Sequence, residues 1–218
     1  MKVHDLTSDL YEGMPMFPAS FYPAPKMEFI LEPESDPAHR YVGKFEISNH
    51  TGTHLDAPLH YNYGKDKTID QAPVDVLVGE CVVVDMYHKK LAEGIKASDL
   101  AEATVGVDLK NKRLVIRTGY SDKYWGETDY FKNALYLTGD AAQWIVKQGV
   151  VLVGIDFLTD KPGDSSLPAH NELLQNGVYI LEYMVNVKDL PPTCTLVVAP
   201  LKLKGMEASP CRVYAIEI

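Results

Sequence analysis

Three of the chain's seven histidines fall within eleven residues, in the segment HTGTHLDAPLH that runs from His50 to His60. His50, His54 and His60 offer imidazole nitrogens, and Asp56 adds a carboxylate between the second and the third. Neutral nitrogen ligands combined with a carboxylate suit Zn²⁺, Mn²⁺ or Fe²⁺. The segment therefore predicts a site for a divalent metal ion.

The spacing of these ligands excludes a helix. At 100° per residue Asp56 would lie about 200° around the helix from His54, and Pro58 would break the hydrogen-bond ladder. In an extended chain all four side chains have the same parity and point to one side. His50 and His54 would then lie about 13 Å apart, too far to share an ion. The chain must curl between them, and Gly52 is the residue that is free to do so.

A second stretch offers further ligands. Glu182 lies on an otherwise apolar face of a predicted strand, and a buried carboxylate must be neutralised, paired or bound to a metal. Its alternative role is a salt bridge to lysine or arginine. His170 lies near a predicted helix that leads back into the same strand. Five or six ligands exceed what one tetrahedral zinc requires, so a second ion bridged by Asp56 or Glu182 is plausible.

The elements that must position these residues alternate along the chain. A short helix is expected from Ser98, a second from its N-cap Thr138 to Gly149, and a third from Pro168 to Gly177. Runs rich in Val, Ile and aromatic residues predict strands at 26–31, 41–48, 80–86, 113–118, 150–155, 178–184, 195–199 and 212–216. The alternation predicts an α/β protein, and the many strands per helix argue against a doubly wound sheet.

Composition narrows the class of protein. A hydrophobic content of 46% and the absence of a linker predict one domain over residues 1–218. The formal charge of −9 argues against nucleic acid as a partner. No apolar run has the length of a membrane span or the form of a signal peptide, so we expect a cytoplasmic protein that does not bind membranes. Cys81, Cys194 and Cys211 are expected to be reduced core residues.

The proline-rich stretch from Tyr11 to Pro25 is too apolar for solvent and too irregular for a strand. It is expected to form an ordered loop, either a strap over the core or an aromatic lid on a pocket. Phe17, Phe21 and Tyr22 are its candidates for contact with a small-molecule substrate.

The sequence resembles the cyclase-like metal-dependent hydrolases, which include bacterial kynurenine formamidase and isatin hydrolase. The segment from His50 to His60 matches that family's His-x-Gly-Thr-His-x-Asp-x-Pro-x-His signature. Further matching stretches are Arg117-Thr-Gly-Tyr120, Gly154-Ile-Asp156, Pro168-Ala-His170 through Ile180-Leu-Glu182 to Asn186, Pro200-Leu-Lys202, Gly205 and Ser209-Pro-x-Arg212. The pattern departs from the family at Pro18-Ala19 and at Gly205-Met-Glu207-Ala, two places expected to flank the substrate and not the metal.

The resemblance implies a swivelling β/β/α architecture with mixed sheets, assembled as a homodimer or homotetramer. It implies that His50, His54, Asp56, His170 and Glu182 bind one or two metal ions, zinc foremost and manganese as the alternative. His60 is implied to be the acid/base residue, and its alternative is a ligand of a second ion.

The function implied is hydrolysis of a small amide by metal-activated water, with the formamide of N-formylkynurenine as the leading substrate. A cyclic amide or lactone, as in isatin hydrolase, is the alternative substrate. Two other classes stay open on the residues: a non-haem iron oxygenase with a two-histidine, one-carboxylate site, and a metal-binding protein without catalytic activity. The oxygenase leaves His50, His60 and Glu182 without a role.

Overall fold

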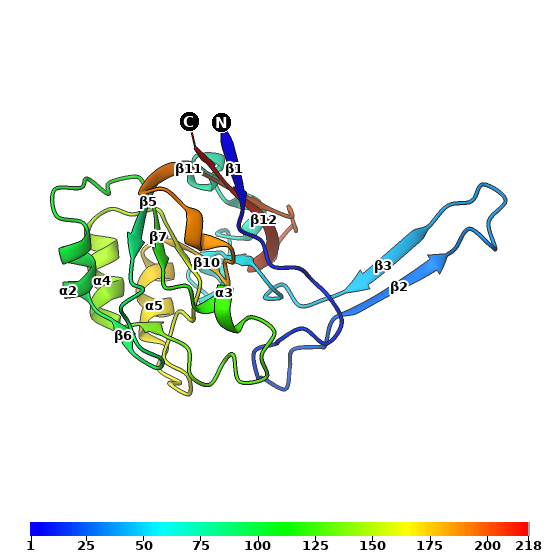
Figure 1. Cartoon of the computed structure of the whole chain (residues 1–218), viewed down its shortest axis with the longest axis horizontal. Helices are drawn as coiled ribbons and strands as arrows, with labels where there is room; N and C mark the ends of the chain where they lie inside the picture. Colours follow the sequence, from blue (N-terminus) through cyan, green and yellow to red (C-terminus); the bar gives the residue numbers. More distant parts are fainter. Residues whose placement is uncertain (218) are drawn as a thin grey trace.

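The computed structural model describes residues 1–217 (Figure 1). Its strands are β1 (Lys2–Asp5), β2 (Lys26–Leu31), β3 (Val42–Glu46), β4 (His54–Asp56), β5 (Val78–Asp85), β6 (Gly94–Ile95), β7 (Arg113–Arg117), β8 (Tyr136–Leu137), β9 (Leu152–Ile155), β10 (Tyr179–Glu182), β11 (Thr193–Pro200) and β12 (Ala208–Glu217). Its helices are α1 (Val74–Leu77), α2 (Ala97–Ala103), α3 (Tyr120–Tyr124), α4 (Gly139–Lys147) and α5 (Pro168–Gln175), with 3₁₀ turns η1 (Pro58–Tyr61), η2 (Ile69–Gln71) and η3 (Val187–Asp189).

The main sheet closes into a barrel. Its strand order is β1-β12-β11-β5-β7-β9-β10-β4, and β12 pairs with β4 as well as with β11. Strands β5, β7, β9 and β10 run parallel, whereas β4, β11 and β12 pair antiparallel with their neighbours. The sheet is therefore mixed, and the predicted α/β class is confirmed. Closure leaves β4 hydrogen-bonded on both sides.

Alternate residues of the parallel strands pack into two separate cores. Val82 of β5 and Leu114 of β7 belong to the core shared with α2, α4 and α5, which lie together on one side of the barrel in Figure 1. Val83 and Val115 belong to a second core that also takes residues from β4, β11 and β12, and so fills the barrel. Strands buried on both faces are expected to read as continuous apolar runs, as these do.

The predicted elements are largely confirmed. Thr138 is the N-cap of α4, and Pro168 is the first residue of α5. Gly149 and Gly177 follow these helices with positive φ angles of 74° and 76°. The sequence did not predict β1, β4, β6 or β8, because none of these strands carries a run of Val, Ile or aromatic residues. No helix within residues 1–217 is long and apolar enough to cross a membrane. The single domain over residues 1–218 stays a prediction.

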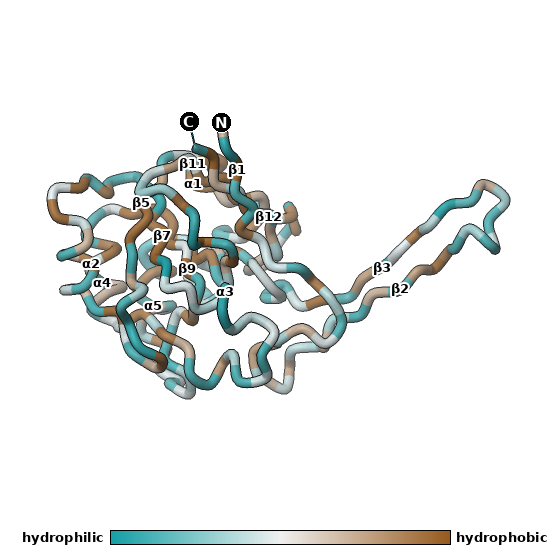
Figure 2. Tube along the Cα trace, viewed as in Figure 1, coloured by the Kyte–Doolittle hydropathy of each residue, from teal (hydrophilic) through white to brown (hydrophobic). Residues whose placement is uncertain are grey.

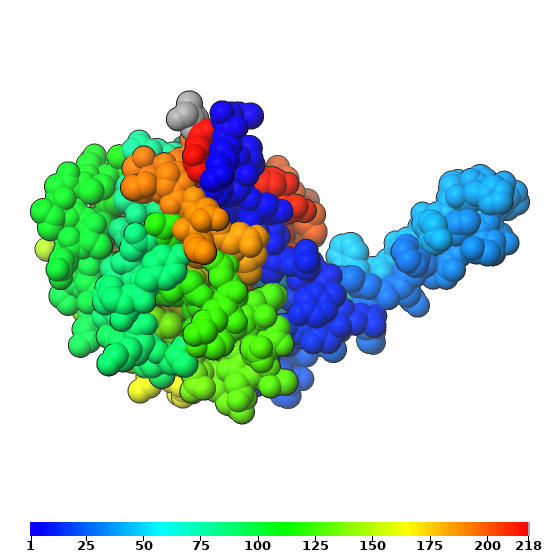
Figure 3. Space-filling view, in the orientation of Figure 1, coloured from blue at the N-terminus to red at the C-terminus, as the bar shows by residue number. Residues whose placement is uncertain are grey.

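The hairpin of β2 and β3 extends away from the barrel as an arm (Figures 1 and 3). Phe29 and Phe45 on this arm are 61% and 62% exposed, and Ile30 and Tyr41 are similarly open. Figure 2 shows apolar stretches along both strands of the arm. An isolated two-stranded hairpin is only marginally stable. Much of the apolar surface of this arm is not covered by other residues of the chain.

Asp156 follows β9 and holds the loop after β7. Its Oδ1 accepts hydrogen bonds from the Thr118 amide at 2.8 Å and the Thr118 hydroxyl at 2.9 Å, while its buried Oδ2 has no partner within residues 1–217. Burial raises the pKa of Asp156 to about 7, against these hydrogen bonds. Asp156 thus supports a loop, and no hydrogen bond within residues 1–217 joins its side chain to the predicted metal ligands.

The raised pKa of Asp156 predicts a pH-dependent stability. Between its ordinary pKa of 3.8 and about 7 the folded chain keeps a proton that the unfolded chain releases. The free energy of unfolding should therefore fall as pH rises through this window, by about 1.4 kcal/mol for each pKa unit of the shift. Asp156→Asn keeps an acceptor for Thr118 and cannot ionise, so urea midpoints measured at pH 5 and pH 7.5 should differ less than in the wild type. An unchanged difference would contradict the prediction.

Candidate metal centre

The pairing of β4 with β10 brings the two predicted ligand stretches together. His54 lies opposite Glu182 in the register, and Asp56 lies opposite Ile180. His54 Nε2 is 3.4 Å from Asp56 Oδ1 and 3.4 Å from Glu182 Oε2. His54 and Asp56 are completely buried and Glu182 is 5% exposed. The shared parity inferred for His54 and Asp56 places both side chains on one face of β4.

Gly52 supplies the predicted curl that brings His50 to the same point. Its φ is +61°, and a Cβ here would come within 2.5 Å of a Leu10 methyl and 2.9 Å of the Ser8 hydroxyl. The curl leaves His50 Nδ1 3.0 Å from Asp56 Oδ1. Thr53 pins the segment by donating to the Tyr183 carbonyl at 2.8 Å.

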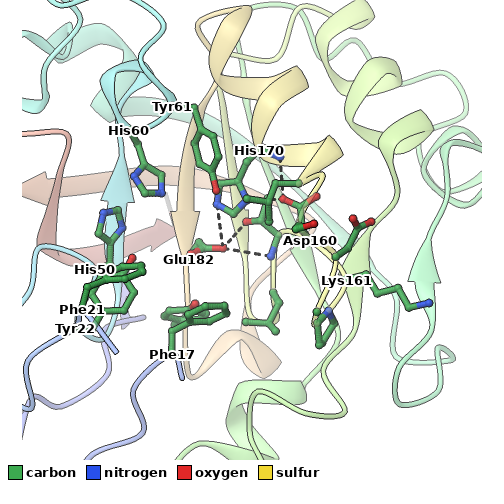
Figure 4. A pocket seen from close by; sticks show the side chains of 18 residues that line it. Phe17, Phe21, Tyr22, His50, His60, Tyr61, Asp160, Lys161, His170 and Glu182 are labelled. Atoms are coloured by element: carbon green, nitrogen blue, oxygen red, sulfur yellow. Dashed lines mark hydrogen bonds and ion pairs between the residues drawn. The ribbon is translucent and has the colours of Figure 1, made fainter. Parts of the chain in front are cut away.

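Helix α5 supplies the remaining predicted ligand. His170 Nε2 is 3.6 Å from Asp56 Oδ2 and 3.9 Å from Glu182 Oε1 (Figure 4). Glu182 accepts hydrogen bonds from the Thr159 hydroxyl and from the Thr159 amide. No lysine or arginine within residues 1–217 pairs with Glu182, so the salt-bridge alternative is wrong for this residue.

In three of the imidazole rings, the nitrogen that points away from Asp56 contacts a carbonyl or carboxylate oxygen. His54 Nδ1 donates to the Gly52 carbonyl at 2.9 Å, His170 Nδ1 lies 2.5 Å from Asp160 Oδ2, and His50 Nε2 lies 3.2 Å from Glu207 Oε1. In each ring the other nitrogen faces Asp56. Imidazoles that ligate metals are commonly fixed in this way, with the outer nitrogen donating to a carbonyl or carboxylate.

The inner atoms fit a cation. His54 Nε2 and both Asp56 oxygens are buried and make no hydrogen bond within residues 1–217. Unpaired buried polar atoms are costly, and a metal ion would satisfy them together. Donor atoms of two residue sets, His50-Asp56-His60 and His54-Asp56-Glu182, lie within 4.8 Å of one another. Asp56 belongs to both sets, which matches the arrangement expected for two ions bridged by a carboxylate.

The charges of the cluster also call for a cation. Burial disfavours the ionised form of Asp56, but the surrounding imidazoles, His50 first, hold its pKa well below the ordinary value. Burial also favours neutral His54 and His170, yet the adjacent carboxylates raise the pKa of each to about 10. Without positive charge the two buried carboxylates, Asp56 and Glu182, would repel each other.

His60 differs from the other three histidines. It lies in η1, and its ring centroid is 4.2 Å from that of His50 and 5.8 Å from that of His170. Its ring has no hydrogen-bond partner within residues 1–217. Burial, together with repulsion from His50 and His170, lowers the pKa of His60 to about 4, so its ring is neutral at pH 7. Both predicted roles, acid/base residue and ligand, stay open on this geometry.

A cavity of about 430 Å³ opens beside the cluster. His50, His60, His170 and Glu182 reach its wall (Figure 4), and Phe17, Phe21 and Tyr22 of the N-terminal loop line its other side. Phe17 also packs edge-to-face on Phe131 at 5.7 Å between centroids. The N-terminal loop therefore covers a pocket, which favours the lid over the strap.

Sequence reasoning missed two carboxylates that orient histidines. Asp160 accepts from the Ala169 amide at 2.7 Å as well as contacting His170. Glu207 accepts from the Asn49 side chain and contacts His50, so this departure from the family pattern lies beside a predicted metal ligand. That it flanks the substrate stays a prediction. The sequence feature that could have identified Asp160 is its position shortly after β9. Glu207 gave none, since its contact depends on the pairing of β12 with β4.

Comparisons with known proteins identify the family of this chain. A kynurenine formamidase from Bacillus thuringiensis (strain Al Hakam) is 33% identical over 174 residues, 78% of each chain. An isatin hydrolase solved with the product analogue thioisatinate has a TM-score of 0.90 at 27% identity, covering 98% of this chain and 91% of that one. The structure of a predicted metal-dependent hydrolase from Bacillus stearothermophilus has a TM-score of 0.80 at 30% identity, covering 98% and 97%. The profile of the Cyclase family matches residues 4–160. This chain belongs to the Cyclase family.

Proposed function

We propose that this protein hydrolyses the formamide of a small aromatic substrate of the N-formylkynurenine type. The chain is a metal-dependent hydrolase by its relatives and its family, acting on C–N bonds other than peptide bonds. The observation that carries the substrate class is an imidazole and carboxylate cluster at the wall of a cavity lined by aromatic rings. The oxygenase alternative lacks support from these relatives.

The ligands of the proposed site are His50, His54, Asp56, His170 and Glu182, which would hold one or two divalent ions. Zinc is the ion we propose first, with manganese as the alternative, because imidazole and carboxylate serve both. When bound, such an ion lowers the pKa of a coordinated water from 15.7 to about 7 and polarises a carbonyl group. Asp160 and Glu207 keep the rings of His170 and His50 oriented for this task.

His60 is the proposed proton carrier. Its neutral imidazole accepts the proton that the attacking water gives up, and then donates it to the departing nitrogen. The C–O bond forms first at the formyl carbon, and the C–N bond then breaks as the nitrogen takes up the proton, giving formate and an aryl amine. The absence of a hydrogen bond behind His60 leaves its ring free to change protonation state, unlike those of His54 and His170.

Phe17, Phe21 and Tyr22 are the proposed contacts for the aromatic ring of the substrate. Phe21 is 76% exposed and Phe17 40% exposed, so burial against a flat ligand would remove apolar surface from water. A cyclic aromatic amide of the isatin type fits the same lining, and it is the second candidate because an isatin hydrolase shares the fold so closely.

The test is formate release from N-formylkynurenine by zinc-loaded protein, with and without a chelator. We expect turnover that chelation abolishes and added zinc restores, with isatin assayed in parallel by ring opening. Turnover that survives complete metal removal would reject the mechanism. If the protein opens isatin but releases no formate, a cyclic amide of the isatin type replaces N-formylkynurenine as the proposed substrate.

We also propose that the protein is a homodimer or homotetramer in which the β2–β3 arm contacts another copy. The support is the exposed apolar surface of Phe29, Ile30, Tyr41 and Phe45 on an arm that its own chain leaves uncovered. The double variant Phe29→Ser, Phe45→Ser should shift the mass measured by light scattering toward the monomer. A wild type that is monomeric at high concentration would reject this proposal.

A further inference from the structure

Tyr61 lies on the cavity wall next to the proposed proton carrier. It is the last residue of η1, directly after His60, and it is half-buried. Its ring centroid is 4.6 Å from that of His60, edge-on at 84°, and 5.1 Å from that of His170, tilted by 32°. Two imidazoles therefore fix the direction of the phenol. Figure 4 shows the ring extending alongside His170 toward Glu182.

The hydroxyl of Tyr61 makes no hydrogen bond within residues 1–217, whereas three tyrosines outside the cavity lining have hydrogen-bond partners. Tyr63 donates to Asn171 Oδ1 at 2.6 Å, Tyr120 donates to the Tyr130 carbonyl at 2.5 Å, and Tyr130 pairs with the Ser121 hydroxyl at 2.6 Å. A phenol held rigidly beside a reaction site, without a protein acceptor, is available to a ligand.

Tyr61 can act as a hydrogen-bond donor. A tyrosine phenol is protonated at neutral pH and offers an O–H group. Its suitable partner is an oxygen atom that gains negative charge during the reaction.

We propose that Tyr61 is a further catalytic residue, whose hydroxyl donates a hydrogen bond to the carbonyl oxygen of the scissile amide. The proposal rests on the proposed amide hydrolysis. His60 and Tyr61 are neighbours in one 3₁₀ turn, so the first can serve the amide nitrogen while the second serves the amide oxygen. The hydrogen bond strengthens as the carbonyl oxygen acquires charge, and such a donor accelerates the chemical step more than it tightens substrate binding.

The test compares Tyr61→Phe with Tyr63→Phe, each of which removes one oxygen atom from the same segment. Loss of a single donor of this kind lowers kcat by about 10²-fold, with KM expected to stay within about 3-fold. Tyr63→Phe should retain kcat within about 3-fold, because its hydroxyl bonds to Asn171 and not to the cavity. Zinc content, measured by mass spectrometry, should be equal in all three proteins.

A binding measurement provides a readout apart from turnover. Phenylglyoxylate, a carboxylate resembling the product of cyclic amide opening, is titrated into each zinc-loaded protein by calorimetry. Loss of a hydrogen bond to a charged oxygen should weaken binding to Tyr61→Phe by about 10-fold or more, while Tyr63→Phe binds as the wild type does.

The outcomes separate this inference from the proposed function. If the wild type releases formate and Tyr61→Phe matches it in kcat and in phenylglyoxylate affinity, the role of Tyr61 is overturned and the hydrolase stands. If the wild type releases no formate, the formamidase proposal falls, and the titration alone decides on Tyr61: weaker binding by the variant supports the donor, and equal or absent binding in both proteins overturns it. A fall in zinc content in Tyr61→Phe would also overturn it, since the residue would then support His170.

Discussion

Asp56→Asn is expected to abolish metal binding at the cluster and to lower the rate of formamide hydrolysis by a factor on the order of 10³ or more, because water activation depends on the ion. Asp56 is the residue common to both sets of donor atoms, and in the described part of the chain its two oxygens accept no hydrogen bond. Asparagine has nearly the same volume as aspartate but lacks the negative charge. It also replaces one of the two carboxylate oxygens with an NH₂ group, which cannot bind a cation. The expected loss of metal binding therefore comes from the change in charge and in ligand atom, with little change in packing.

The measurement for Asp56→Asn is zinc stoichiometry after dialysis, followed by formate release at saturating zinc. Asp75→Asn is the matched control, because Asp75 is exposed and lies in α1, away from the cluster. A folded Asp56→Asn protein that keeps its full zinc content and half its turnover would rule out Asp56 as a ligand. Circular dichroism establishes whether the variant is folded.

His60→Ala is expected to lower kcat by about 10²- to 10⁴-fold, the usual contribution of a positioned acid/base group, while zinc content stays unchanged. The ring carries no hydrogen bond within residues 1–217 and is neutral at pH 7, so its nitrogen is available to accept a proton. Because removal of a proton carrier does not disturb the ion, added imidazole at high concentration should restore part of the turnover.

The same variant decides between the two roles of His60. If His60 is a ligand, His60→Ala loses zinc along with activity, and a site for two ions would fall from two equivalents to one. His88→Ala serves as the control, because His88 is exposed on the segment after β5. Full turnover by His60→Ala would remove the residue from the mechanism.

The part of the site that could be predicted from sequence is the part encoded by local spacing. The parity of His54 and Asp56 and the freedom of Gly52 to curl the chain follow from backbone geometry alone. Glu182 was recognisable because a carboxylate on an apolar strand face needs a partner. Each of these inferences uses residues within one short segment.

The remaining part depends on pairings between distant segments. Glu207 reaches His50 only because Ala208 of β12 lies opposite Asp56, across an interval of more than 150 residues. Asp160 reaches His170 because the chain after β9 returns onto the first turn of α5. Neither contact follows from hydrophobic periodicity, and β4 is too short to show that β12 would be its neighbour.

The double pairing of β4 has a consequence for biosynthesis. Until β12 has left the ribosome, one edge of β4 has no partner, and Glu207 is not available to hold His50. The site with His50 held by Glu207 can therefore form only after β12 has been synthesised. An earlier intermediate would expose the open edge of β4, and an unpaired strand edge is prone to pairing with other chains.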